Sequence, residues 1–164
     1  MAFDAKTGKP RTLLMRGVDA LSRRDYSRLE LERKLGRGLR EGEGAEELEA
    51  ALDVLQKRGY LDDGRYAKSR VRARAARYGN RRLAAELAMM GVASDEIKES
   101  LKEAGSEYER ALALWRKKFG APPEDRKARD KQVRYLASRG FDFDVISRVI
   151  ESAGDEEFEE DGAL

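Results

Sequence analysis

One short sequence pattern recurs three times along this chain, and it constrains the fold more than any other feature. A leucine is followed four residues later by a glycine, and an apolar residue follows the glycine. The three copies are Leu55–Gly59–Tyr60, Leu87–Gly91–Val92 and Leu136–Gly140–Phe141. This spacing is typical of a Schellman helix end, where glycine adopts the left-handed conformation and the next residue packs back on the helix. Asp62, Ser94 and Asp142 follow the copies, and we expect each to cap the next helix. The pattern therefore predicts three helix–corner–helix joints.

Recurring joints in a chain of 164 residues indicate a tandem repeat. Apolar residues recur at helical spacing and no segment shows strand-like alternation, so we predict an all-α fold. Nine short helices in three groups of three would form an elongated, curved stack of three-helix repeats. The predicted units are a disordered N-terminal arm (1–12), repeat 1 (13–62), a basic repeat 2 (63–105), repeat 3 (106–154) and an acidic tail (155–164) that starts after Gly154.

The repeats also align at an aromatic residue that ends the first helix of each: Tyr26, Tyr78 and Phe119. In the second repeat we predict a long arginine-rich helix that reaches about Arg77 before Gly79 breaks it. Four glycines between residues 36 and 44 predict the one flexible loop within the body.

Composition excludes several classes of function. The chain has no Cys and no His, so it lacks thiol chemistry and the commonest general base and metal ligand. No convergent acid–base set appears, so we predict no enzyme activity, no catalytic residue and no metal site. No run approaches the roughly 18 apolar residues of a membrane span, and the N-terminus does not resemble a signal peptide. We therefore expect a cytoplasmic protein with no membrane partner.

The main candidate site is a cluster of cations uninterrupted by acids. Arg70, Arg74, Arg77 and Arg81 step by four, three and four, so they would share one face if the helix persists that far. Such a face can follow a phosphate backbone or meet an acidic protein groove. The alternative is a solvated helix face, which usually mixes both signs of charge. The candidate partner-binding residues are Arg65, Lys68, Arg70, Arg72, Arg74, Arg77, Arg81 and Arg82.

For three other motifs, a structural role is a better interpretation than a functional one. The glycines of residues 36–44 lack the strand and the Gly-Lys-Ser/Thr ending of a phosphate-binding loop. The carboxylate pairs Asp62–Asp63 and Asp142/Asp144 lie just past helix ends, where capping is the expected role. Trp115 and Phe119 could stack on bases, but their spacing is that of a core stripe. The acidic tail is either a solubility tail or a segment that folds over the arginine face; both alternatives stay open.

These elements in this order resemble the RecX family of bacterial regulatory proteins. The resemblance spans about residues 13–153, and it depends on order and spacing rather than on any single piece. Its residues are Ala20–Leu21, Arg24–Asp25–Tyr26–Ser27, Glu30–Leu31, Lys34–Leu35, Leu55, Gly59–Tyr60–Leu61–Asp62–Asp63, Tyr66–Ala67, Arg81, Glu86–Leu87, Gly91–Val92 and Arg139–Gly140–Phe141.

The resemblance implies a function that the residues alone do not give. RecX-like proteins bind the RecA filament in its helical groove, suppress its ATPase, strand-exchange and co-protease activities, and so modulate homologous recombination, DNA repair and the SOS response. They can also bind DNA, and they are not enzymes. We therefore expect a monomer whose partner is the RecA filament, with DNA as a possible second partner. The alternative is a stand-alone helical nucleic-acid-binding protein with helix-turn-helix-like modules that acts without RecA.

Overall fold

The computed structural model describes residue 5 and residues 8–161, with side chains described as far as residue 155. Half of the predicted N-terminal arm (residues 1–4, 6 and 7) lies outside these residues, as do residues 162–164. The described part contains nine helices and no β-strand, which confirms the all-α prediction. The helices are α1 (Leu13–Arg23), α2 (Arg28–Gly36), α3 (Ala45–Lys57), α4 (Asp63–Arg74), α5 (Asn80–Met89), α6 (Ser94–Lys102), α7 (Glu107–Lys118), α8 (Arg126–Ser138) and α9 (Phe143–Asp161).

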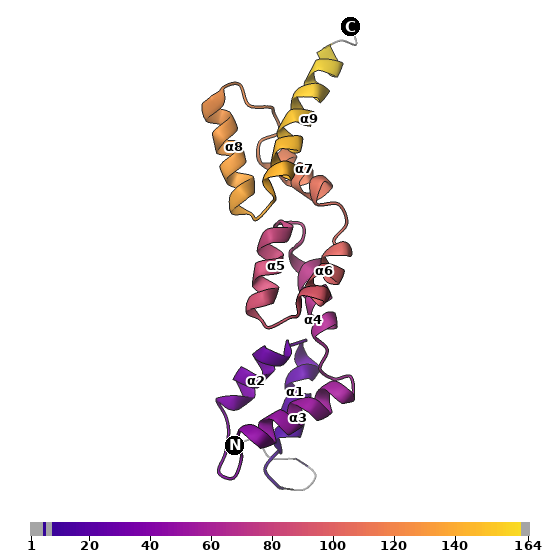
Figure 1. Ribbon diagram of the computed structural model, residues 1–164, viewed down its shortest axis with the longest axis vertical. Helices are drawn as coiled ribbons and strands as arrows, with labels where there is room; N and C mark the ends of the chain where they lie inside the picture. The colour runs from indigo at the N-terminus through magenta and orange to yellow at the C-terminus, as the bar shows by residue number, and fades with distance from the viewer. Residues whose placement is uncertain (1–4, 6–7, 162–164) are drawn as a thin grey trace.

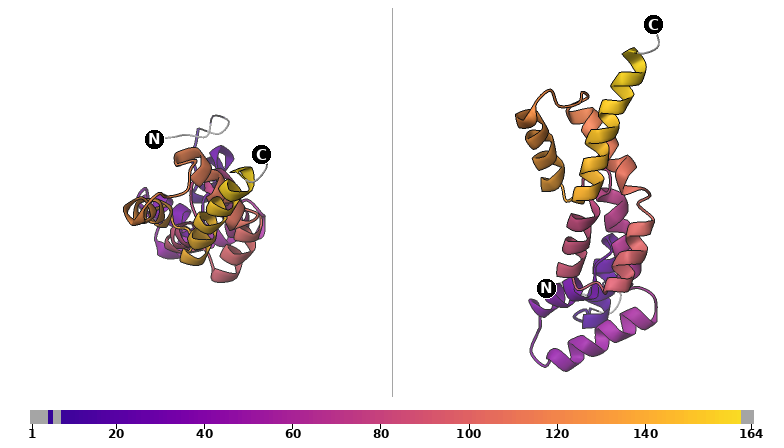
Figure 2. Two further views of the ribbon diagram at one scale, coloured as in Figure 1. Left: turned by 90° about the horizontal axis from the view of Figure 1, so that it is seen from above. Right: turned by 45° about the horizontal axis from the view of Figure 1, so that its top comes forward.

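The helices form three groups of three that follow one another along an elongated molecule (Figure 1). Repeat 1 comprises α1–α3, repeat 2 comprises α4–α6 and repeat 3 comprises α7–α9. In each repeat the first and third helices pack most closely, and the second helix lies beside them. Viewed along the length of the stack, the repeats lie over one another (Figure 2). Each repeat has its own hydrophobic cluster, so the molecule has three small cores in place of one large core.

The glycine joints form as the sequence predicts. Gly59, Gly91 and Gly140 have φ angles of 79°, 77° and 86°, in the left-handed region. At the first joint, the N–H of Tyr60 donates to the carbonyl of Leu55 and the N–H of Gly59 donates to that of Gln56, which is the Schellman pattern. The other two joints repeat these bonds. The expected caps are only partly confirmed.

The side chain of Asp62 accepts a hydrogen bond from the backbone N–H of Arg65, as a helix cap should. Ser94 does not cap α6, because the helix begins at Ser94 itself and the preceding residue is Ala93. The side chains of Ser27 and Ser106 cap α2 and α7, where they accept from the backbone N–H groups of Glu30 and Glu109.

Two predicted helix ends are wrong. α4 ends at Arg74 rather than near Arg77, because residues 75–78 turn and lead into the close contact that Gly79 makes with repeat 3. α9 does not end at Gly154 but continues to Asp161, so residues 155–161 are the last turns of that helix. Glutamates are good helix formers and outweigh the cost of about 1 kcal/mol for a single glycine. This end of α9 points away from the other two repeats (Figures 1 and 2), so its backbone does not fold over α4.

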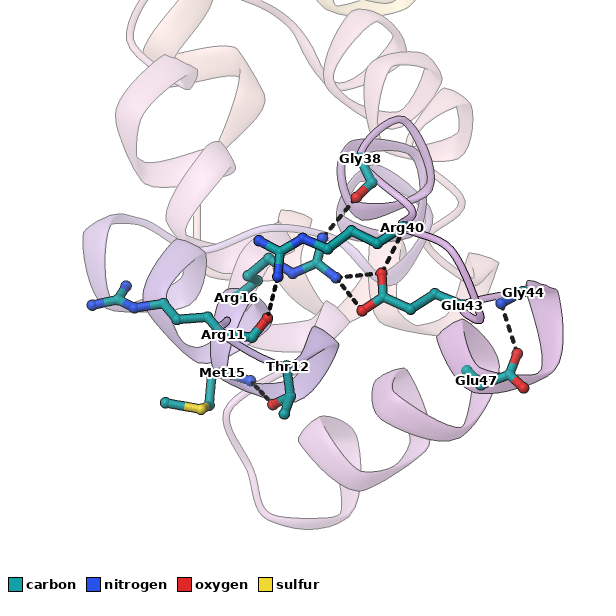
Figure 3. Close-up of polar contacts among 9 residues, drawn as sticks. All are labelled: Arg11, Thr12, Met15, Arg16, Gly38, Arg40, Glu43, Gly44 and Glu47. Carbon is teal, nitrogen blue, oxygen red and sulfur yellow. Dashed lines mark hydrogen bonds and ion pairs between the residues drawn. The ribbon is translucent and has the colours of Figure 1, made fainter. Parts of the chain in front are cut away.

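The glycine-rich loop between α2 and α3, which we expect to be flexible from its sequence, is anchored by side-chain hydrogen bonds (Figure 3). Arg16 on α1 donates to the carbonyl of Gly38 at 2.7 Å and to the carboxylate of Glu43 at 2.6 Å. Glu43 also accepts from the backbone N–H of Arg40 at 2.9 Å. The Arg16 hydrogen bond holds the pKa of Glu43 below its usual range. The glycine content of the loop cannot reveal this anchoring, because Arg16 belongs to another helix.

Repeats 2 and 3 join backbone to backbone. The N–H of Gly79 donates to the carbonyl of Arg139 at 2.8 Å, and the N–H of Arg81 donates to that of Gly140 at 3.1 Å. A Cβ atom placed on Gly79 would lie 2.4 Å from the backbone of Gly140, so only glycine permits this approach.

Repeats 1 and 2 join mainly through side chains. The carboxylate of Asp63 accepts from the backbone N–H of Arg28 at 2.7 Å. Arg65 pairs with Asp25 across the same joint at 3.1 Å.

Candidate protein and nucleic-acid interface

The eight candidate cations do not form one continuous helical face. Because α4 ends at Arg74, Arg77 lies in the following turn, and Arg81 and Arg82 lie in the first turn of α5. The face predicted from the four-three-four spacing is therefore divided between two helices and a turn.

Arg74 is the most deeply engaged of these cations. Its guanidinium donates two hydrogen bonds to Glu86, at 2.9 and 2.8 Å, and lies over the ring of Tyr78 at 4.4 Å. Hydrogen bonding to Glu86 raises the pKa of Arg74. Burial alone would raise the pKa of Glu86, but the hydrogen bonds from Arg74 and Arg82 outweigh it and lower that pKa. With 22% of its side chain exposed, Arg74 ties α4 to α5 and is not free to bind a partner.

Four more of the candidates also have acidic partners within the protein. Arg65 pairs with Asp25 and donates to the carbonyls of Gly59 and Tyr60. Lys68 and Arg72 both pair with Glu103, at 3.3 and 3.1 Å, which connects α4 to the end of α6. Arg82 pairs with Glu86 at 3.2 Å and lies 4.2 Å from the ring centroid of Tyr78.

Among the described residues, three candidates have side chains that make no hydrogen bond or ion pair: Arg70, Arg77 and Arg81. All three are exposed. They are the members of the predicted cluster whose charge is available to a partner. The charges of the paired members are partly offset by acids elsewhere in the fold, although exposed pairs of this kind contribute only about 0–1 kcal/mol.

A second basic surface lies in repeat 3, and the sequence interpretation missed it. α8 carries five cations and one acid, Asp130, and Lys117 and Lys118 extend the surface at the end of α7. Within the described chain, none of these cations has an acidic side-chain partner in an ion pair. The α8 cations are Arg126, Lys127, Arg129, Lys131 and Arg134. A sequence signal existed, since Lys127, Lys131 and Arg134 step by four and three, but Asp130 interrupts the run.

An aromatic seam connects the two basic surfaces. Arg139 lies between two rings, 5.6 Å from the centroid of Tyr78 and 5.3 Å from that of Tyr135. Lys118 also lies over the ring of Tyr135, 5.5 Å from its centroid. The cations of α5 thereby lie next to those of repeat 3, and contacts of this kind stabilise cations at aromatic faces.

The remaining candidates have structural roles. Trp115 is buried, and its indole N–H donates to Gln132 at 2.8 Å, so it belongs to the core of repeat 3. Phe119 meets Tyr135 edge to face at 5.4 Å. Among the described residues no group of three His, Cys, Asp or Glu side chains could hold a metal ion. None of the helices in that part of the chain has the length and apolar character needed to span a bilayer.

The fold and these surfaces define a tandem three-helix repeat protein with basic surfaces on its second and third repeats. Comparison with known proteins identifies the family. Family models described as the second and third three-helix domains of RecX match residues 62–101 and 106–150. The chain is 45% identical to the regulatory protein RecX of Ralstonia pickettii (strain 12J), over 95% of this chain and 96% of that protein. It is 39% identical to that of Chromobacterium violaceum, over 92% of this chain and 97% of that protein.

A crystal structure of RecX from Lactobacillus salivarius has the same fold. It superposes with a TM-score of 0.70 at 21% identity, covering 87% of this chain and 97% of that one. The chain belongs to the RecX family, and it is accordingly a regulatory protein with the helical-repeat fold of that family.

Proposed function

We propose that this protein binds the RecA–DNA filament and inhibits the ATPase, strand-exchange and co-protease activities of RecA. The observation that carries the proposal is the family relation, which spans nearly the whole chain. The elongated shape supports it, because successive repeats could contact successive protomers along a groove (Figure 1). The protein would act by binding alone, without a cofactor, in the cytoplasm and as a monomer.

The contacts to the filament would come from the free cations of repeat 2. Arg70, Arg77 and Arg81 are exposed and lack an acidic partner in the described chain. Arginine suits both carboxylates and phosphates, because its planar fork can donate two hydrogen bonds to either. In this proposal Arg65, Lys68, Arg72, Arg74 and Arg82 hold the shape of the surface and do not contact the partner directly.

Co-sedimentation with RecA filaments on single-stranded DNA, with and without nucleotide, tests the binding. A parallel ATPase assay tests the inhibition. The triple variant Arg70→Ala/Arg77→Ala/Arg81→Ala should weaken both by about tenfold or more, because each lost charge-assisted contact is worth about 1 kcal/mol or more. Circular dichroism should show unchanged helix content.

The matched control removes the same charge from exposed residues elsewhere, in the variant Lys57→Ala/Arg58→Ala/Lys98→Ala. This control should inhibit RecA as the wild type does. Full inhibition by the Arg70/Arg77/Arg81 variant would remove the site assignment. A wild-type protein that does not sediment with the filaments would remove the proposed function.

The basic surface of repeat 3 favours a second candidate, a nucleic-acid-binding protein that acts without RecA. The cations of α8 suit a polyanion such as a nucleic acid, because their binding to its phosphates would release condensed counterions. Binding to a naked DNA oligonucleotide across a salt series separates the two candidates. A DNA binder should lose affinity steeply with salt, gain little from RecA, and depend on Lys127, Lys131 and Arg134. A RecA modulator should prefer the filament at every salt concentration.

A further inference from the structure

Repeat 2 contains a pocket of about 280 Å³ between α4 and α5. Its floor is apolar and buried, formed by Val71, Leu83 and Leu87. α4 and α5 make few contacts with each other, since α4 packs mainly on α6, and this leaves the opening between them. A pocket of this size and lining suits one large apolar side chain.

Met89 marks the mouth of this pocket. It lines the pocket, yet 73% of its surface is exposed, the largest fraction among the exposed large hydrophobic residues of the described chain. Met90 beside it is half-buried and lines the same pocket. Methionine adapts its shape to a partner surface, and methionine, aromatic residues and arginine are enriched at the centres of protein interfaces.

The charges at the pocket decide which partner fits. Arg74 and Glu86 line it as a hydrogen-bonded pair, so their charges offset each other. Arg70 also lines it, is exposed, and has no acidic partner among the described residues. The pocket therefore offers an apolar floor with one free cation beside it. A phosphate backbone fits poorly, because it would meet apolar walls and the carboxylate of Glu86.

We propose that this pocket is a protein-docking site that receives an apolar side chain of a partner with a carboxylate one or two residues away, which pairs with Arg70. The inference rests on the proposed function, in that the partner segment belongs to the RecA protomer facing repeat 2. It adds the apolar contact that cation pairing alone does not supply, and buried apolar anchors carry most of the affinity at protein interfaces.

The first test measures the affinity of the full-length protein for RecA filaments on single-stranded DNA. The variant Met89→Glu places a carboxylate at the mouth of the pocket and should weaken binding about tenfold, as expected for the loss of one anchor contact. Met89→Leu should bind as the wild type does. Phe143→Glu is the matched control, because Phe143 is also an exposed apolar residue, 60% exposed, but lies in repeat 3.

Arg70→Glu should weaken filament binding to a similar degree, and Lys98→Glu, an equal change of charge on α6, should not. Naked DNA should bind Met89→Glu and Phe143→Glu equally well. The inference is overturned if Met89→Glu binds filaments as tightly as Phe143→Glu, or if Met89→Glu loses DNA and filament affinity equally. If Met89→Glu and Phe143→Glu bind filaments equally well and the wild type also binds, only the docking site is ruled out and the proposed function is retained. A wild type that does not bind the filament removes both.

A photo-reactive benzoylphenylalanine in place of Met89 tests the chemistry of the partner directly. Irradiation of the assembled complex should give a covalent adduct with RecA. The cross-linked peptide should contain an apolar residue within two positions of Asp or Glu. An adduct only with DNA, or a cross-linked peptide without an acidic residue at that spacing, would contradict the proposal.

Discussion

Arg110 is the side chain that most clearly ties one repeat to the next. From α7 it donates to the backbone carbonyls of Ala75 and Tyr78, both at 3.0 Å, and to the side chain of Asn80. Burial lowers its pKa, and nearby Glu107 opposes that effect. The guanidinium thus satisfies two carbonyls of the turn after α4, where the helix no longer supplies donors.

We predict that Arg110→Leu destabilises the protein by about 2–4 kcal/mol, because several buried acceptors lose their donor at once. Urea unfolding followed by circular dichroism measures the change. Arg23→Leu is the control, since Arg23 is 77% exposed and makes only an i,i+4 pair with Asp19. That change should cost no more than about 0.5 kcal/mol, and equal costs for the two variants would contradict this role for Arg110.

The Arg16–Glu43 pair predicts a dependence of stability on pH. The pKa of Glu43 is lowered in the folded state, chiefly by the hydrogen bond from Arg16. Its contribution to stability is therefore fully present above the ordinary glutamate pKa of 4.5 and is lost as the pH falls through the lowered value. Glu43→Gln should be less stable than the wild type at pH 7. Urea unfolding at pH 7 and at pH 3 should show the gap narrowing in acid, and a gap independent of pH would be inconsistent with the pair.

At the scale of helices and joints, local rules predict the glycine corners well. Schellman ends depend on a few neighbouring residues, so the three glycines and their hydrogen bonds are visible in the sequence. The end of α4 is not visible in the sequence. Residues 75–78 are held by the hydrogen bonds of Arg110 and by the backbone hydrogen bond from Gly79 to Arg139, both far along the chain. Helical spacing continues through Arg77 although the helix does not.

The candidate site shows the same limit. Spacing within α4 correctly places Arg70 on an exposed surface. It cannot show that Arg74 pairs with Glu86, Lys68 with Glu103 and Arg65 with Asp25, because these partners lie 12 to 40 residues away. Ion pairs formed in the tertiary structure thus separate cations that look alike in the sequence into those with an acidic partner and those without one. The α8 surface was not identified from the sequence. Its cations are interrupted by Asp130, so they do not form an uninterrupted run like that of residues 65–82.

Two glycine joints offer a matched comparison. Gly105 and Gly140 both have left-handed φ angles, of 75° and 86°. A Cβ on Gly105 would meet nothing, whereas a Cβ on Gly140 would lie 2.3 Å from the Cβ of Arg82. Gly105→Ala should therefore cost about 1 kcal/mol, the conformational penalty alone. Gly140→Ala should cost about 3 kcal/mol or more, because the repeat 2–3 contact must also shift. Denaturant unfolding measures both, and equal losses would contradict the close contact.

For the whole molecule, stability is distributed over three cores and two joints. Helices pack mainly on other helices of the same repeat, and few helix–helix contacts cross from one repeat to the next. Such a stack behaves as a row of units coupled by their interfaces. Loosening one joint should therefore affect its two neighbours and leave the third repeat unchanged.

Asp63→Ala tests this coupling. The Asp63 carboxylate accepts from the backbone N–H of Arg28 across the repeat 1–2 joint. Its loss should speed hydrogen exchange at the start of α2 by about tenfold, as expected for roughly 1.4 kcal/mol of lost protection. Exchange in α7–α9 should not change, as measured by mass spectrometry on peptides. Faster exchange throughout repeat 3 would show that the chain unfolds as a single unit.

The two joints also differ in how they should respond to mechanical force. Repeat 2 meets repeat 3 through paired main-chain hydrogen bonds and glycines too close for any other residue. Repeat 1 is attached through side chains: the carboxylate of Asp63 on the N–H of Arg28, the Arg65–Asp25 pair, and Leu29 against Gly91. A molecule pulled from its ends would therefore release repeat 1 first and keep the other two as one stiff rod. Laid along a helical partner, that rod would set the direction of the molecule, and repeat 1 would swing to match the pitch.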